Sequence, residues 1–158
     1  MRVVCGLLIL TLTAVTVSAS NESKLDVGVR AKGAKKVVLA TVSDVKAEMG
    51  ENDYGDSLIL SRVTMRVNET MKGAHEANVA VTIEGGTIGE ITLEVSDMPV
   101  LQEGDRAVVF LEDSKKGGYV PHRRGLGVMK VDESNDVEGT DMNLDDVRAA
   151  VKAAEGGR

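Results

Sequence analysis

Apolar and polar residues alternate along much of the chain after residue 36. Val63, Met65 and Val67 alternate with the polar residues at positions 62, 64 and 66. Two further stretches, Val79–Ile83 and Ile91–Val95, follow the same pattern. Because successive side chains of a strand point to opposite faces, a period of two indicates a strand with one face buried. The pattern therefore predicts three half-buried strands.

Other stretches are apolar over consecutive positions. Val37–Val42 is rich in β-branched residues, which favour strands. Ala107–Leu111 is apolar at every position and predicts a central strand that is buried on both faces. A last pair of strands is predicted at Tyr119–Val120 and Leu126–Val131, with Pro121 interrupting the chain between them.

Short turns separate these strands. The polar segment 52–56 supplies one turn, and Gly85 and Gly86 support positive φ at a hairpin or a bulge. Gly89 indicates a bulge or a close backbone approach. Five to seven short strands joined by such turns predict a mainly β domain, either a sandwich or a small closed barrel.

The last part of the chain changes to a helical period. Apolar residues recur there at Leu144, Val147, Val151 and Ala154. Asn143 precedes them as a predicted N-cap, so we expect a C-terminal α-helix over 143–156. The charged residues 132–142 predict an acidic connector that leads to this helix.

The segment before the first strand has no strong pattern. Residues 20–36 are mostly polar and include Gly28 and Gly33. These glycines argue against a long helix, because glycine in a helix interior costs about 1 kcal/mol relative to alanine. We therefore interpret 20–36 as a lead-in segment to a β-barrel domain over 37–131.

The first residues have the layout of an export signal. Arg2 supplies a positive start, an apolar run extends over Val3–Val17, and small residues follow up to Ala19. This layout predicts a signal peptide over 1–19 with cleavage near Ala19, and hence a secreted or periplasmic protein. An uncleaved anchor is the alternative, but the run is shorter than the roughly 20 residues that span a bilayer.

Cleavage there would change the composition. It would leave 139 residues (158 − 19), enough for one hydrophobic core, and would remove Cys5, the single cysteine. A chain without cysteine has no disulfide, no thiolate metal site and no cysteine nucleophile. Loss of Arg2 leaves 18 basic residues (19 − 1) against 25 acidic residues, a net charge of −7. An acidic chain poor in aromatic residues is a poor nucleic-acid binder, so we expect no nucleic-acid partner.

Three segments carry a resemblance to known proteins. They are EGGTIG at 84–89, LEVSDMP at 93–99 and EGDRAVVFL at 103–111. In this order of glycine hairpin, apolar-proline loop, Gly-Asp turn and strand ending in Phe-Leu, the chain resembles a poorly characterised family of secreted bacterial β-barrel proteins. The resemblance covers about Val37–Val131. It implies a small closed OB-like β-barrel, distantly similar to netrin and metalloproteinase-inhibitor modules, and it implies no activity or functional residues.

Few residues point to metal or catalytic chemistry. His75 and His122 are the two histidines, and a zinc site usually needs three or four protein ligands. No serine lies in a Gly-x-Ser-x-Gly pattern, and the glycine segment 85–89 lacks the lysine of a phosphate-binding loop. We therefore predict no catalytic residue, no metal site and no cofactor. The oxygen-rich stretch 132–138 is a weak calcium candidate, although it lacks the residue order of an EF-hand loop.

Two segments are candidates for binding a partner. His122, Arg123 and Arg124 form the densest basic patch of the expected mature chain, which would suit an anionic group or an acidic protein face. The hairpin with Gly85, Gly86 and Gly89 is the second candidate. A solvated turn and a structural bend are the alternative interpretations of the two segments.

The sequence therefore predicts a secreted, non-enzymatic binding module whose partner is another secreted or envelope protein. Three alternatives stay open. The first is an inhibitor of a secreted protease, which rests on fold analogy. The second is a hydrolase that uses paired carboxylates. The third is a structural envelope protein held by weakly bound calcium.

Overall fold

A computed structural model describes residues 19–156, so the expected signal peptide over 1–19 lies outside the described residues apart from Ala19. In chain order the elements are α1 (Ala19–Gly33), β1 (Lys36–Glu51), β2 (Ser57–Lys72), β3 (Asn78–Glu84), β4 (Gly86–Ile88), β5 (Ile91–Leu93), β6 (Arg106–Asp113), β7 (Tyr119–Pro121), the 3₁₀ turn η1 (Arg124–Gly127), β8 (Val128–Val131) and α2 (Leu144–Gly156). Within this part of the chain, neither α-helix is long and apolar enough to cross a bilayer.

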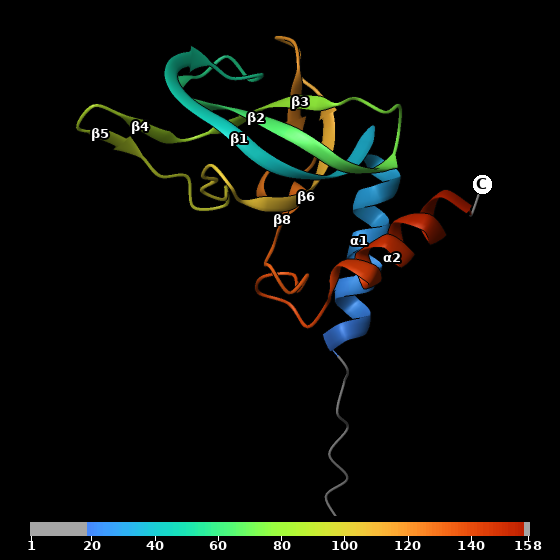
Figure 1. The fold of residues 1–158 in the computed structure, drawn as a ribbon. Coiled ribbons are helices and arrows are strands. Elements are labelled where there is room, and N and C mark those ends of the chain that lie inside the picture. The colour runs from blue at the N-terminus through green and yellow to red at the C-terminus, as the bar shows by residue number, and fades with distance from the viewer. Residues whose placement is uncertain (1–18, 157–158) are drawn as a thin grey trace, which may run out of the picture.

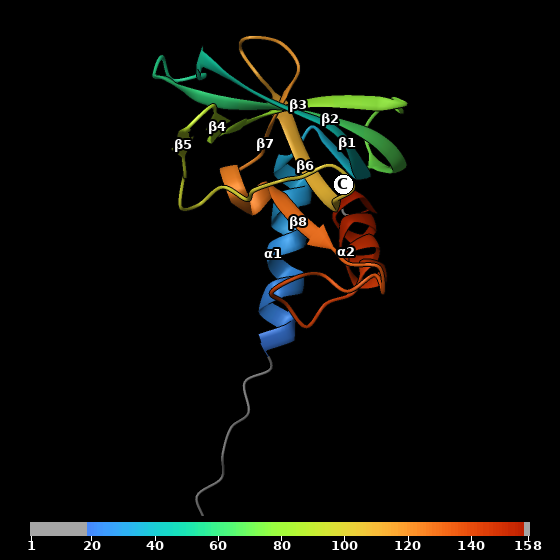
Figure 2. The same ribbon diagram turned by 60° about the vertical axis from the view of Figure 1, so that its left-hand side comes forward.

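Five strands are joined in a ring of pairings (Figures 1 and 2). β1 pairs with β2, β2 with β3, and β6 with both β1 and β7, and all of these pairings are antiparallel. The ring is completed by a parallel pairing of β3 with β7, which consists of one residue pair, Val81 with Tyr119. β7 and β8 share one edge of β6, β7 beside 111–113 and β8 beside 106–109. The mainly β architecture with a C-terminal helix confirms the coarse prediction.

The ring has an apolar cluster on each side of its wall. The inner cluster contains Val109 and Leu111 of β6, and the helix-side cluster contains Val108 and Phe110 of the same strand. All of these side chains are fully buried. The prediction that 107–111 is buried on both faces is confirmed, because alternate side chains of β6 enter different clusters.

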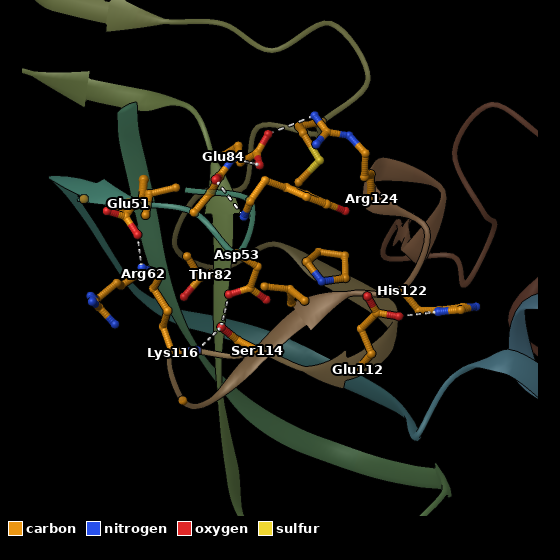
Figure 3. A pocket seen from close by; sticks show the side chains of 18 of the residues that line it. Glu51, Asp53, Arg62, Thr82, Glu84, Glu112, Ser114, Lys116, His122 and Arg124 are labelled. Carbon is orange, nitrogen blue, oxygen red and sulfur yellow. Dashed lines mark hydrogen bonds and ion pairs between the residues drawn. The ribbon is translucent and has the colours of Figure 1, made fainter. Parts of the chain in front are cut away.

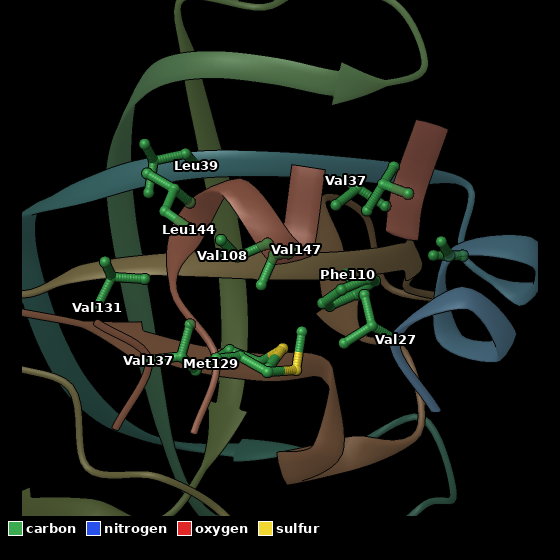
Figure 4. Close-up of a cluster of buried hydrophobic side chains, with 14 of the residues drawn as sticks. Val27, Val37, Leu39, Val108, Phe110, Met129, Val131, Val137, Leu144 and Val147 are labelled. Carbon is green, nitrogen blue, oxygen red and sulfur yellow. The ribbon is translucent and has the colours of Figure 1, made fainter. Parts of the chain in front are cut away.

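Both helices cover the same side of the ring (Figure 2). α1 and α2 lie against each other and pack on β6, β8 and the first part of β1. Figure 4 shows the resulting helix-side cluster, with Phe110 beside Val27 of α1 and Leu144 and Val147 of α2 over Val108. The predicted N-cap of α2 is confirmed, since Asn143 Oδ1 accepts hydrogen bonds from the backbone N–H groups of residues 145 and 146, at 2.9 and 3.1 Å.

The lead-in segment differs from the prediction, because α1 is a helix of 15 residues that contains Gly28 and ends at Gly33. Tertiary packing outweighs the glycine penalty here, since Val27 and Ala31 are fully buried in the helix-side cluster. Lys72 of β2 also donates a hydrogen bond of 2.7 Å to the Ala31 carbonyl oxygen in the last turn of the helix.

The connector and the glycine hairpin also differ in detail from the prediction. Residues 132–142 are charged, but Val137 and Met142 within them are buried in the helix-side cluster. β4 and β5 form a two-stranded sheet of their own beside the ring (Figure 1). The described residues hold eight strands in all, and the main sheet has six of them, within the predicted five to seven.

Candidate functional site

A cleft of about 510 Å³ opens on the face of β2 and β3 that points away from the inner cluster (Figure 3). Strand residues that line it are Leu60 and Arg62 of β2, Thr82 and Glu84 of β3, and Glu112 of β6. The rest of the wall comes from the end of β1 and the following turn at 50–54, from the β6–β7 turn within 114–117, from Met98, and from 120–124. Leu60, Val120 and Pro121 contribute apolar surface, and charged side chains surround them. We call this hollow the cleft.

The two turns at the mouth of the cleft are tied together. Asn52 shapes the β1–β2 turn, because its Oδ1 accepts hydrogen bonds from the backbone N–H groups of residues 54 and 56, at 3.0 and 2.9 Å. Asp53 then reaches the β6–β7 turn and accepts hydrogen bonds from Ser114 Oγ at 2.8 Å and from the Lys115 backbone at 3.1 Å. These contacts hold the mouth of the cleft in one shape.

The charged groups of the cleft neutralise one another. Glu51 pairs with Lys116, and Arg62 pairs with Glu48 just outside the cleft. Glu112 Oε2 lies 2.6 Å from His122 Nδ1. Most of these side chains are substantially exposed, so such pairs exchange easily with those of a bound molecule. The cleft therefore suits a ligand that brings both charges.

Arg124, one of the predicted binding residues, joins two acidic residues at the edge of the cleft. Its Nε donates to Asp97 Oδ2 at 2.7 Å, and its Nη2 lies 2.9 Å from Glu84 Oε2. The hydrogen bond from Arg124 holds the pKa of the Asp97 carboxyl below its usual range, and the two carboxylates raise the pKa of the Arg124 guanidinium. We call Glu84, Asp97 and Arg124 the Glu84 latch.

The backbone around this latch is strained. Arg123 and Arg124 have φ values of 61° and 60°, in the left-handed region that residues with a Cβ rarely adopt. Gly125 follows and lies so close to the Asp97 carbonyl that a Cβ atom there would overlap it. The chain is thus pressed against the 94–101 loop, and the Glu84 latch fixes that contact.

The two histidines lie in separate places. His122 lies between Glu112 and the end of α1. Its imidazole group occupies the space that a side chain at Gly33 would need. His75 belongs to the β2–β3 loop, where its Nδ1 lies 3.2 Å from Thr70 Oγ1. Across residues 19–156, no group of three or more potential ligands gathers in a metal-binding arrangement.

The predicted glycine segment lines a second hollow. Gly85 and Gly86 have φ values of 103° and 135°, and a Cβ on Gly86 would lie 2.5 Å from Ser61 Oγ. Together with Ile83 and other apolar residues they line a cavity of about 530 Å³, which we call the inner cavity. Gly89 is in the β4–β5 turn, where its φ is 59° and a Cβ atom would point into open space.

The predicted surfaces thus adjoin through side chains that the sequence did not single out. Glu84 and Met98 line both the cleft and the inner cavity, and the Glu84 latch joins the glycine segment to the basic patch. Gly89 takes no part in this arrangement. The turn signal at 52–56 marked one wall of the cleft, but a turn signal carries no information on what faces it.

A second cluster that sequence reasoning missed surrounds Lys36, whose side chain is 3 % exposed. Lys36 Nζ lies 2.5 Å from Glu76 Oε1, and Tyr119 Oη donates to the same oxygen at 2.6 Å. The hydrogen bonds from Lys36 and Tyr119 lower the pKa of Glu76, and the bond to Glu76 together with burial raises the pKa of Tyr119 to about 12. We call Lys36, Glu76 and Tyr119 the Glu76 latch.

In the calcium candidate at 132–138, side-chain oxygen atoms of Asp132 and Asn135 accept hydrogen bonds from protein groups. Asp132 Oδ1 accepts hydrogen bonds from the backbone N–H groups of Ser134 and Asp136, at 2.8 and 2.9 Å. Arg106 donates a 2.9 Å hydrogen bond to Asn135 Oδ1. These contacts describe a hydrogen-bonded turn.

Comparison with models of known protein families finds no family that matches the chain, and comparison with curated protein sequences finds no related protein.

Proposed function

We propose that this chain is a secreted, non-enzymatic binding module whose five-stranded ring is a small OB-type barrel. The order of pairings, β1-β2-β3-β7-β6 and back to β1, supports the barrel, because OB folds are five-stranded and partly open. The partner in this proposal is a polypeptide segment of another secreted or envelope protein.

The position of the cleft carries the proposal. OB folds bind extended ligands on the face of strands 2 and 3, between the loop that joins strands 1 and 2 and the loop that joins strands 4 and 5. In this chain β6 and β7 stand in the places of strands 4 and 5. The cleft lies over β2 and β3, between the β1–β2 turn and the β6–β7 turn. Its volume of about 510 Å³ is within the range of ligand-binding sites.

The lining of the cleft supports a polypeptide rather than a nucleic acid as ligand. Its charged residues are of both signs, with Glu51, Asp53, Glu84 and Glu112 against Arg62, Lys116, Arg123 and Arg124. A nucleic-acid groove would be basic and lined by aromatic side chains, whereas Tyr54 at the rim is the aromatic residue here. The mixed charges and apolar floor suit a peptide with charged and apolar side chains.

The contacts of the cleft carboxylates favour binding over hydrolysis. A carboxylate hydrolase of the glycosidase type needs two carboxyl groups facing each other across the substrate. Here Glu51 faces Lys116, Asp53 faces Ser114, and Glu112 faces His122. Each of these three carboxylates is thus engaged by a lysine, a hydroxyl group or an imidazole ring.

A displayed library of random heptapeptides, selected for binding to this protein, tests the proposal. The cleft variant Arg62→Glu/Lys116→Glu reverses two exposed charges of the cleft, and we expect it to weaken the selected peptides at least tenfold. The control Lys32→Glu/Lys152→Glu makes the same change of charge on the exposed surface of α1 and α2. Isothermal titration calorimetry measures both, and peptides that bind the cleft variant as tightly as the wild type would refute the cleft as the binding site.

A further inference from the structure

The ring is weakest at the line between β3 and β7, which we call the seam. Among the described residues, the backbone pairing across it is limited to Val81 with Tyr119. β7 ends at Pro121, which has no N–H group to donate to a neighbouring strand. Beyond Val81, no strand within residues 19–156 pairs with the edge of β3 at Thr82–Glu84.

The register of β2 and β3 shows which backbone groups face this edge. Gly85 N donates to Ile59 O at 2.8 Å, and Val67 N donates to Ala77 O at 2.9 Å. Since hydrogen-bonded residues recur at every second position of an antiparallel ladder, the odd-numbered residues of β3 bond to β2. Glu84, which is opposite Leu60, then directs its N–H and C=O away from β2 and into the seam.

We infer that a partner polypeptide binds by adding an extended strand to the β3 edge in the seam. This inference rests on the proposed function and specifies how the cleft binds. The backbone groups of Glu84 call for a main-chain partner, because a strand edge recognises another extended chain through its N–H and C=O groups. Both hollows open along this edge, with Thr82 and Glu84 lining the cleft and Ile83 and Glu84 lining the inner cavity.

The two hollows also define the side chains of the added strand. Successive side chains of a strand point to opposite faces, so those of the partner would enter the cleft and the inner cavity in turn. The cleft has paired charges, and the inner cavity is lined mainly by apolar residues such as Val63, Ile83 and Leu101. The partner segment therefore alternates charged or polar residues with aliphatic residues.

Site-resolved amide hydrogen exchange tests this inference, with the selected heptapeptides as the probe. Saturation with peptide should slow exchange of the Glu84 amide at least tenfold. Gly85 is the matched control, because its amide already donates to Ile59 O in the free protein. Peptides are also N-methylated at the odd or at the even positions. One set should bind about tenfold more weakly, as expected for loss of one main-chain hydrogen bond, and the other set should bind almost as tightly as the unmodified peptide.

A pair of variants isolates the backbone donor. Glu84→Ala removes the side chain and keeps the N–H group, whereas Glu84→Pro removes both. We expect Glu84→Pro to bind the peptide about tenfold more weakly than Glu84→Ala. Thermal melting checks that both variants fold, and if Glu84→Pro does not, amide exchange in the wild type decides.

The outcomes separate the two proposals. Peptides that are sensitive to Arg62→Glu/Lys116→Glu but leave Glu84 exchange and N-methylated binding unchanged would overturn strand addition and leave the binding function standing. Peptides that bind the cleft variant as tightly as the wild type would overturn both proposals. A third outcome is that exchange of the Glu84 amide slows as the protein concentration rises in the absence of peptide. This would overturn strand addition by a partner, since the added strand would then come from a second copy of this chain.

Discussion

The two sides of the ring are closed in different ways. On one side, α1 and α2 cover the wall, and the helix-side cluster lies between, with side chains such as Phe110 and Val147 fully buried. At the seam, one residue pair joins β3 to β7, with the Glu76 latch near one end and the Glu84 latch near the other. Burial of apolar surface is not directional, whereas ion pairs near water are weak and exchangeable. Stability is therefore concentrated on the helix side, whereas the recognition that we propose lies at the seam.

The largest expected effect comes from breaking the helix side. Phe110 is the single phenylalanine of the chain and is 0 % exposed. Phe110→Ala should lower the free energy of unfolding by about 3–5 kcal/mol, because it leaves a cavity under α1. Urea denaturation measures this loss. Ile91→Ala in the exposed β4–β5 hairpin is the control and should stay within about 0.5 kcal/mol of the wild type. A loss below about 1 kcal/mol for Phe110→Ala would contradict the assignment of stability to this side.

An effect of intermediate size on the melting temperature is expected at the Glu84 latch. Arg124 of the latch and its neighbour Arg123 have the same left-handed backbone conformation. Arg123→Gly relieves a φ of 61° and gives up an ion pair that is 3.9 Å long, so it should leave the melting temperature unchanged or raise it. Arg124→Gly relieves the same strain but loses the contacts to Asp97 and Glu84. We expect Arg124→Gly to melt about 3–6 °C below Arg123→Gly in calorimetry. Equal melting temperatures would show that the latch contributes nothing.

The smallest effect concerns the Glu76 latch and its response to pH. Because the pKa of Glu76 is lowered from 4.5, its contribution to stability is present above pH 4.5 and is lost as the pH falls through the folded-state value. Because the pKa of Tyr119 is raised from 10.0 to about 12, its contribution is present below pH 10 and is lost between pH 10 and 12. Glu76→Gln should therefore reduce the dependence of the free energy of unfolding on pH, both below pH 4.5 and above pH 10.

Phenolate absorbance gives an independent measure of the same latch. The chain has two tyrosines, and Glu76→Gln should move the titration of Tyr119 from about 12 toward 10. A variant with an unchanged tyrosine titration would mean that Glu76 does not set the pKa of Tyr119. Glu48→Gln is a suitable control, since Glu48 pairs with Arg62 on a different part of the surface.

The strands could be predicted because their signals are local. The alternation of apolar and polar residues predicted that Val63 and Met65 lie on the buried face of β2. The uninterrupted apolar run 107–111 predicted that β6 is buried on both faces, and it does lie between two clusters. α1 could not be predicted, since what stabilises it is the burial of Val27 and a hydrogen bond from Lys72, 41 residues beyond Ala31. A helix with weak intrinsic preference is decided by such distant contacts.

The candidate site was predicted only in its loops. The basic patch and the glycine segment were identified as separate surfaces, but the contact between Arg124 and Glu84 joins residues 40 positions apart in the chain (124 − 84). The Tyr119–Glu76 bond likewise spans 43 positions. No local pattern encodes these pairs, because they exist only once β3 and β7 have been brought together. The seam therefore could not be seen in the sequence.

The contact between α1 and α2 makes the cover of the helix-side cluster discontinuous in sequence. α1 is the first described element and α2 the last, so this cover is complete only when both helices are in place. Val27 of α1 and Phe110 of β6 belong to the same cluster as Val147 of α2, so detachment of α2 would expose apolar side chains of the other two elements. Because contacts between distant parts of a chain cost loop-closure entropy, we expect the helix side to form late in folding.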